Sequence, residues 1–240
     1  MNNKKELVIG VVGGMGSYAT LGLFERLLES FPANKEWERP RIIIDNYCTM
    51  PSRVRAVLYH EKENELMQML SDSIKNLIRI GCTHIVLACN TSHIFLQKIL
   101  LQESQLRPFV VDIIEKCHAE LKKESIKEFS ILATEGTIES KLYDLYFNDG
   151  ISVFYPSKDQ FSKIRHFIEV VKTNSIDYSE CEQFFNFIED MQSTNVLLGC
   201  TELPLLFRKG KEYGLLTTKK IFDPLESVIV FLKKEFEIND

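Results

Sequence analysis

Two stretches decide the fold of this chain: residues 83–92, THIVLACNTS, and residues 195–204, NVLLGCTELP. Each contains a short apolar run followed by a cysteine and small polar residues. A run of this length, bounded by polar residues, is typical of a strand buried on both faces of a sheet. Both stretches therefore predict a buried strand that ends at a cysteine, Cys89 in the first and Cys200 in the second.

Similar apolar runs recur elsewhere along the chain and alternate with helical patterns. The other predicted strands are 7–12, 41–45, 109–111, 129–133 and 151–154. Apolar residues at three- and four-residue spacing predict helices over 19–30, 61–80, 161–171, 180–191 and 225–236. Strands that alternate with helices indicate an α/β fold with parallel sheets.

The order of these elements repeats. In each half a strand leads into a short turn and a helix, a second strand follows, and a long helix precedes the strand that ends in cysteine. We therefore predict two similar, Rossmann-like domains related by a pseudo-two-fold axis. Equivalent positions would then set Cys89 and Cys200 across one cleft, which we predict to be the active site.

The repeat also predicts where the domains begin and end. We expect an N-terminal α/β domain of residues 1–105 plus 208–240, which carries Cys89, and a second domain of residues 106–207, which carries Cys200. The helix after Asp223-Pro224 comes too late for the second repeat, so we expect it to pack back on the first domain.

Composition and charge argue against several classes of protein. The chain has 240 residues, 45% of them hydrophobic, which is enough for one large core or two small ones. Its net charge of -5, with 29 basic and 34 acidic side chains, gives no electrostatic footprint for nucleic acid. The apolar run 7–12 is too short for a signal peptide or a membrane span. We therefore expect a cytoplasmic protein that binds neither nucleic acid nor membrane.

Six cysteines and five histidines could in principle form disulfides or a metal site. A chain with this apolar content needs no disulfides, so we expect reduced thiols. Cys-x-x-Cys pairs are absent from the sequence, and the histidines form no pair at ligand spacing, so no metal site is predicted.

The positions of the two cysteines suggest acid/base chemistry. In open parallel sheets, ligands bind beyond the carboxyl ends of the strands. Asn90, Thr91 and Ser92 favour a helix start after Cys89, whose free N–H groups can hold a carboxylate and favour a thiolate. Two thiols on opposite faces of an α-carbon can remove and return its proton without a cofactor, and one must be ionised while the other is protonated.

Four stretches resemble the aspartate/glutamate racemase family, most closely its aspartate racemase branch. They are 13–16 (GGMG), 88–93 (ACNTSH), 134–137 (TEGT) and 198–204 (LGCTELP), and they follow the family's order over nearly the whole chain. The resemblance implies a cofactor-independent racemase that interconverts the L- and D-enantiomers of a small acidic amino acid. Aspartate is the first expectation, glutamate the second, and a homodimer is expected.

The resemblance also implies roles for individual residues. Cys89 and Cys200 would be the catalytic acid/base pair. Substrate-binding residues would be Met15, Arg53, Asn90, Thr91, Thr134, Lys172 and Thr201. Among these, Arg53 and Lys172 are the candidates for holding the distal carboxylate.

The sequence departs from the family's pattern at three positions. Ser17 and Ser52 stand where proline and aspartate are usual, and Arg55 adds a cation near Arg53. These departures bear on substrate identity more than on reaction type. His93 either packs or supports the thiolate, and the role of Glu202 is open. The cysteines without a repeated context are interpreted as packing residues: Cys48, Cys82, Cys117 and Cys181.

Two other classes of function stay open at this point. Residues 14–19, GMGSYA, match the glycine motif of NAD-dependent oxidoreductases, and Asp45 ends the next predicted strand. Asp45 lies farther along the chain than that motif requires, and both thiols would then be idle. The other alternative is a non-catalytic amino-acid-binding protein of the same fold, which has no need of two cysteines in equivalent places.

Overall fold

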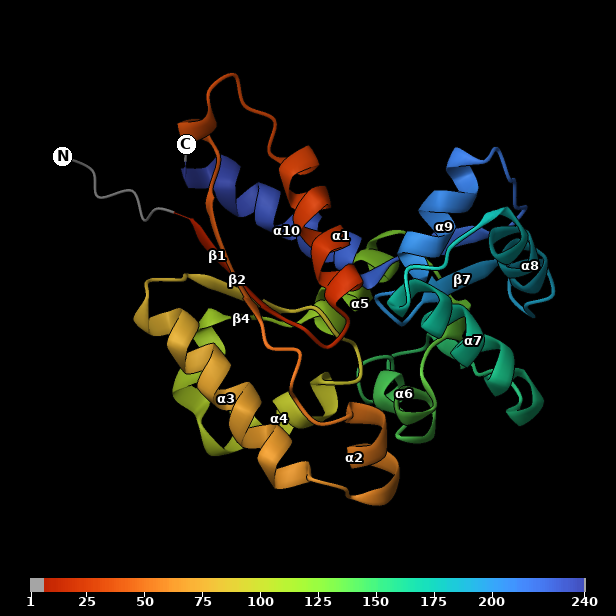
Figure 1. Ribbon diagram of the computed structural model, residues 1–240, viewed down its shortest axis with the longest axis horizontal. Coiled ribbons are helices and arrows are strands. Elements are labelled where there is room, and N and C mark those ends of the chain that lie inside the picture. Colours follow the sequence, from red (N-terminus) through yellow and green to blue (C-terminus); the bar gives the residue numbers. More distant parts are fainter. Residues whose placement is uncertain (1–6, 240) are drawn as a thin grey trace.

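The computed structural model describes residues 7–239, with side chains as far as Phe236. Its first four strands form a parallel sheet in the order β2-β1-β3-β4, and its last four form a second parallel sheet in the order β6-β5-β7-β8. The two sheets thus have the same strand order, which confirms the predicted α/β fold of two similar domains (Figure 1). The strands are β1 (Val8–Gly13), β2 (Arg41–Asn46), β3 (His84–Leu87), β4 (Val110–Val111), β5 (Glu128–Leu132), β6 (Ser152–Phe154), β7 (Asn195–Leu198) and β8 (Lys220–Phe222).

Helices connect the parallel strands, as this topology requires. Those of the first half are α1 (Ser17–Ser30), α2 (Arg53–Tyr59), α3 (Glu63–Arg79), α4 (His93–Gln102) and α5 (Ile113–Lys123). Those of the second half are α6 (Glu135–Glu139), α7 (Phe161–Lys172), α8 (Tyr178–Glu189), α9 (Leu203–Glu212) and α10 (Pro224–Asn239). Four short 3-10 helices complete the described elements: Glu36–Glu38, Ser104–Phe109, Leu142–Leu145 and Lys158–Gln160.

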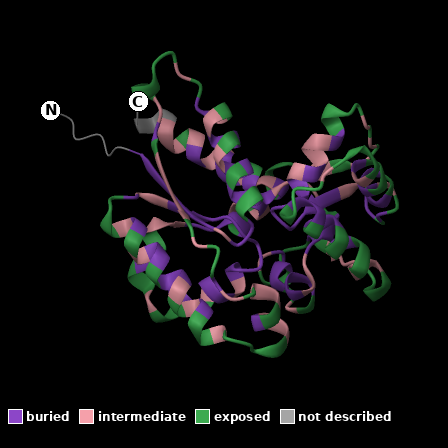
Figure 2. Cartoon of the chain, viewed as in Figure 1, coloured by how far each residue is buried: buried purple, intermediate pink, exposed green. Residues whose placement is uncertain are grey.

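Three apolar clusters form the core. One joins the facing sides of the two sheets through α5 and α10, the second lies between the first sheet and helices α3 and α4, and the third lies between the second sheet and helices α7 to α9. The buried strands and the exposed outer sides of the helices are visible in Figure 2. β1 is buried throughout, but β2 and β6 are partly exposed, because each pairs with a neighbour on one side only. The prediction of burial on both faces was therefore wrong for these two edge strands.

The chain passes between the sheets at places that differ from the expected domain ranges 1–105 plus 208–240 and 106–207. Strand β4 lies in the first sheet although it follows residue 105, and β8 lies in the second sheet although it follows residue 208. Sheet pairing thus moves these two short strands to the domain opposite the one expected. The last helix, α10, packs against α5 and α1, and Arg26 of α1 ties it down through ion pairs with Asp223 (2.5 Å) and Glu226 (2.7 Å).

Candidate active site

Cys89 and Cys200 line one cavity between the two domains. Each lies two residues beyond the end of its strand, Cys89 after β3 and Cys200 after β7, and each is nearly buried. The cavity is small, ≈ 50 Å³. Helix α1 of the first domain and helix α7 of the second contact each other across the domain boundary (Figure 1). Strand ends that face each other in this way are where ligands bind in parallel α/β sheets.

The turn after Cys89 is held by its own buried polar groups. The Ser92 hydroxyl donates to the carbonyl of Cys89 (2.7 Å), and His93 Nδ1 lies 3.0 Å from the same carbonyl. The backbone N–H of Ile113 donates to His93 Nε2 (3.4 Å), so this nitrogen accepts and Nδ1 carries the proton. His93 therefore contacts the backbone of Cys89 and positions the turn.

Hydrogen bonds across the domain boundary fasten the two loops together. The Thr91 hydroxyl lies 2.8 Å from that of Thr134 and 2.9 Å from that of Thr137. Thr201 in turn donates to the carbonyl of Ala88 (3.2 Å). Each domain thus contributes a threonine from its cysteine loop to the other domain. Such mutual contacts fix the separation of the two thiols.

A buried carboxylate lies beside one of the thiols. Cys200 Sγ donates to Glu202 Oε2 (3.0 Å), and Glu202 is 3% exposed. Burial raises the pKa of the Cys200 thiol well above its ordinary value, and the Glu202 carboxylate beside it raises the pKa further. At neutral pH Cys200 is therefore a protonated thiol, held in a hydrogen bond to Glu202.

Lys172, the last residue of α7, supplies a positive charge at the cavity wall. Its Nζ donates to Glu169 Oε1 (3.1 Å), and 36% of its side chain is exposed. Burial alone would lower the pKa of Lys172, but the negative charges of Glu202 and Glu169 outweigh burial and raise it. Lys172 thus stays charged between the cavity and the surface.

Two unpaired N–H donors lie at the same cavity. Arg53 donates through its terminal nitrogens to the carbonyls of Met15 (2.6 Å) and Pro51 (3.1 Å), while its Nε is buried without a partner. The Asn90 amide oxygen accepts from Tyr143 (2.7 Å), which leaves the Nδ2 group buried and unpaired. Among the side chains that the structure describes, only Arg208 has another such buried atom. Because an unpaired buried donor is costly, these two groups indicate where a ligand with acceptor oxygens would bind.

The glycine turn after β1 brings the first domain close to Glu202. Gly14 has φ +78°, and a side chain there would collide with the backbone of Tyr47 and Cys48. A Cβ on Gly16 would collide with the Glu202 carboxylate. A dinucleotide pyrophosphate on this turn would meet that negative charge, so these contacts disfavour the NAD-dependent alternative.

All nine residues predicted for the site line this cavity. They are Met15, Arg53, Cys89, Asn90, Thr91, Thr134, Lys172, Cys200 and Thr201. Ser52, Val54 and Glu202 line it as well. The sequence left the role of Glu202 open although it is two residues from Cys200, and Val54 could have been found as the neighbour of Arg53. Arg55 lies outside the cavity, paired with Glu61 on the surface.

The remaining cysteines lie away from the cavity. All six cysteines are free thiols. Cys82, Cys117 and Cys181 are buried in the core, as expected for packing residues. Cys48 is exposed, so its prediction as a packing residue was wrong: it follows the edge strand β2 in a turn at the surface.

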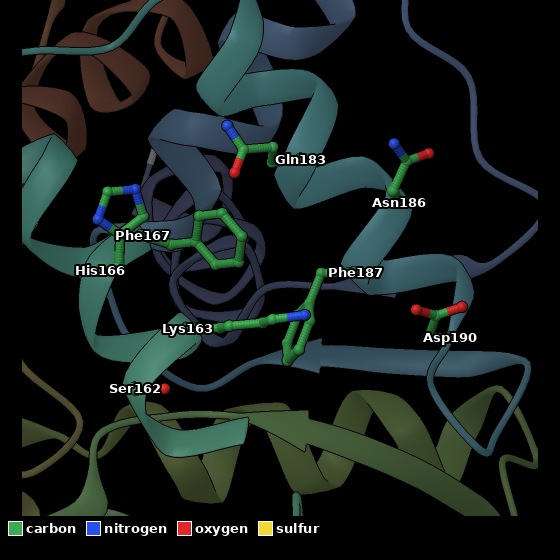
Figure 3. Close-up of a pocket in the computed structure, with 8 residues that line it drawn as sticks. All are labelled: Ser162, Lys163, His166, Phe167, Gln183, Asn186, Phe187 and Asp190. Atoms are coloured by element: carbon green, nitrogen blue, oxygen red, sulfur yellow. The ribbon is translucent and has the colours of Figure 1, made fainter. Parts of the chain in front are cut away.

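A surface groove elsewhere lacks the features of the cysteine cavity. It runs between α7 and α8, and Figure 3 shows His166, Lys163 and Gln183 along it. His166 is engaged with Glu180 (2.8 Å), outside the groove lining. Neither Cys89 nor Cys200 borders this groove.

In the described part of the chain, no three His, Cys, Asp or Glu side chains are grouped closely enough to hold a metal ion. Within those same limits, none of the helices has the length and apolar character needed to cross a bilayer.

Residues 12–229 match the Asp/Glu/hydantoin racemase family. The chain belongs to this family. It is 23% identical to the broad specificity amino-acid racemase RacX of Bacillus subtilis over 82% of this chain and 86% of that protein. Among solved structures, it is similar to the Picrophilus torridus aspartate racemase, with a TM-score of 0.80 and 25% identity over 96% of this chain and 94% of that one.

A glutamate racemase from Francisella tularensis, solved with D-glutamate, shares the fold with a TM-score of 0.66 and 19% identity, over 98% of this chain and 82% of that one. The family match and these relatives identify the chain as an amino-acid racemase.

Proposed function

We propose that this racemase inverts a small acidic amino acid, aspartate in the first place, with Cys89 and Cys200 as its two acid/base groups. The observation that carries the proposal is that two cysteines from equivalent strand ends of the two domains line one cavity. A single buried cysteine is usually a packing residue, but packing gives no reason for two thiols to share a polar cavity.

The chemistry follows from thiols on opposite faces of the substrate. One cysteine, as thiolate, takes the α-proton and becomes a thiol, while the electron pair of the C–H bond stays on the α-carbon. The other cysteine then gives its proton to the opposite face and becomes a thiolate. The substrate is inverted, the two cysteines have exchanged protonation states, and solvent exchange restores the starting state.

Substrate binding is assigned to the unpaired donors and the cations. Arg53 Nε and Asn90 Nδ2 are buried donors that a carboxylate oxygen would satisfy. Lys172 adds a positive charge to the cavity lining, which suits a second carboxylate. The size of the cavity, ≈ 50 Å³, favours a small amino acid. Glutamate is the alternative within the same mechanism.

The test uses single enantiomers of aspartate in deuterium oxide with purified enzyme and no added cofactor. Thiols exchange protons with solvent, so we expect deuterium in the inverted product from its first appearance and none in the remaining starting enantiomer. Nuclear magnetic resonance of the α-position and chiral chromatography measure the two quantities. Product that retains the original hydrogen would exclude two separate thiol donors.

Substitution of the cysteines completes the test. Cys89→Ser and Cys200→Ser should each abolish inversion in both directions, because every turnover needs one residue as base and the other as acid. Cys48→Ser, which changes an exposed thiol outside the cavity, is the matched control and should keep parental activity. A Cys89→Ser or Cys200→Ser enzyme that racemises at the parental rate would overturn the proposal.

A further inference from the structure

A second cavity adjoins the catalytic one, on the side of α6 and α7. It measures ≈ 180 Å³ and shares four lining residues with the catalytic cavity: Ser52, Val54, Thr134 and Lys172. We call it the annex. Figure 1 shows α2, α6 and α7, which carry most of its lining, close together. The two cavities therefore adjoin at these four residues.

The wall of the annex is largely apolar. Ile164 and Ile168 of α7 are 2% and 3% exposed, and Phe161 covers the wall from the first position of the same helix. Ala133 and Val54 face them from the other side. An apolar pocket beside a few directed polar groups is the usual design of a site that selects a ligand by its shape.

The charged groups of the annex are already paired. Arg165 forms an ion pair with Glu135, and Lys172 forms one with Glu169, so the lining carries two cations and two carboxylates. A carboxylate at Lys172, as proposed for aspartate, would have to compete with Glu169 for this cation, whereas an uncharged group leaves both pairs intact. The annex therefore favours uncharged groups of some length.

We propose that the annex is a side-chain subsite, and that the same catalytic site also accepts amino acids with uncharged side chains longer than that of aspartate, such as methionine and leucine. This inference rests on the proposed two-cysteine racemisation. The α-carbon lies between the thiols, the α-carboxylate binds at Asn90, and the side chain passes Val54 toward Ile168. Phe161, Ile164 and Ile168 are then the specificity-determining residues.

The experiment compares the racemisation of L-methionine and L-aspartate, together with the binding of L-methionine by calorimetry. Phe161→Trp fills the annex from its partly exposed mouth, and Ile168→Phe fills it from the buried wall. Tyr178→Trp is the matched control, because Tyr178 is also an aromatic residue at the first position of a helix in this half but does not line the annex.

We expect the parent enzyme to bind and racemise methionine. Phe161→Trp and Ile168→Phe should each lower the ratio of kcat/KM for methionine to that for aspartate by about tenfold or more, the effect of a few misplaced carbon atoms in an apolar pocket. Tyr178→Trp should leave this ratio unchanged.

Several outcomes would overturn the subsite. An enzyme that racemises aspartate but neither binds nor racemises methionine excludes it and leaves the proposed function standing. An equal loss of kcat/KM for both substrates in Phe161→Trp would also exclude the subsite and leave the proposed function standing. If no amino acid is racemised, the proposed function fails, and binding alone decides: methionine binding that Phe161→Trp weakens supports the annex, and no methionine binding excludes it.

Discussion

At the scale of single residues, Glu202 is the group that distinguishes the two thiols. It accepts a hydrogen bond from Cys200, and its charge helps to raise the pKa of that thiol. It also attracts Lys172, which links the protonation of Cys200 to the cation at the cavity wall. One buried carboxylate thus acts on a proposed proton donor and on a proposed binding group.

Glu202→Gln should therefore lower the pKa of Cys200, because a negative charge beside the thiol is removed. Within the proposed mechanism, the resemblance to the family implies that Cys200 acts on the L-enantiomer as thiolate and on the D-enantiomer as thiol. The acid limb of kcat/KM for the L-substrate and the alkaline limb for the D-substrate should both move to lower pH. Glu169→Gln, which removes the other carboxylate beside Lys172, is the control. Unmoved pH profiles in Glu202→Gln would show that Glu202 does not set the pKa of Cys200.

Arg53 and Arg55 offer a second comparison at this scale. Both are arginines in the first turn of α2, but only Arg53 lines the cavity, and Arg55 pairs with Glu61 outside it. Loss of a charge-assisted hydrogen bond to a carboxylate costs about 1.5–3 kcal/mol, so Arg53→Ala should lower kcat/KM for aspartate roughly ten- to more than a hundredfold. Arg55→Ala should leave it unchanged. Equal kinetics in the two variants would place the substrate carboxylate elsewhere.

At the scale of elements, the sequence predicted seven of the eight described strands and missed one edge strand, β8. Strands β1, β3, β5 and β7 occupy the centres of the sheets, where both faces are covered, and their apolar runs reveal them directly. Strand β8 has three residues and exists only because it pairs with β7, so local sequence does not predict it. The cavity shared by the two cysteines could be predicted from the repeat, because both cysteines lie at equivalent strand ends.

Helix α5 was not predicted, although the residues at its start favour a helix. Asp112 precedes the helix and accepts from the N–H groups of Ile114 (2.9 Å) and Glu115 (3.2 Å), and aspartate followed three residues later by glutamate resembles a helix-start pattern. The predicted strand 109–111 lies directly before this helix, and the helix start after it was not recognised. Helix α9 likewise begins with Leu203 and Pro204, and proline in the first turn marks a helix start.

The cap of α5 leads to a prediction of stability. Asp112 is 7% exposed, and its second oxygen accepts from Gln97 (2.9 Å) and Tyr146 (2.7 Å). Asp112→Ala should lower the free energy of unfolding by about 1–2 kcal/mol for the cap and by more because two partly buried donors lose their acceptor. Urea titration followed by circular dichroism measures it. Asp177→Ala, which removes the exposed cap of α8, should cost less, and an equal cost would contradict the role given to the buried network.

At the scale of the whole molecule, the same burial that builds the cavity also places ionisable groups in the core. Cys117 on α5 and Tyr143 are fully buried in the cluster that joins the two sheets, and burial raises the pKa of each above its ordinary value. Both groups are neutral when protonated, so the folded state holds their protons more tightly than the unfolded chain does.

The sign of the resulting pH dependence follows from this difference. The contribution of Cys117 to stability is fully present below the pKa of an unfolded-state thiol, about 8.5. It is lost as the pH rises from there toward the raised pKa of the folded protein, because only the unfolded chain gives up the proton. Tyr143 acts in the same direction at higher pH, above the pKa of an ordinary phenol, about 10.

Cys117→Ala isolates one of these groups, because the variant lacks the thiol whose proton is released on unfolding. At neutral pH, Cys117→Ala should be less stable than the parent because the substitution leaves a cavity. This difference in the free energy of unfolding should shrink by about 1.4 kcal/mol per pH unit between about pH 9 and 10.5. Urea titrations of both proteins at each pH measure it under reducing conditions. Cys48→Ala removes an exposed thiol and controls for effects of thiol chemistry alone. A difference between parent and Cys117→Ala that stays constant over this range would mean that the Cys117 thiol ionises as readily in the folded protein as in the unfolded chain, and that the core around α5 is open to water.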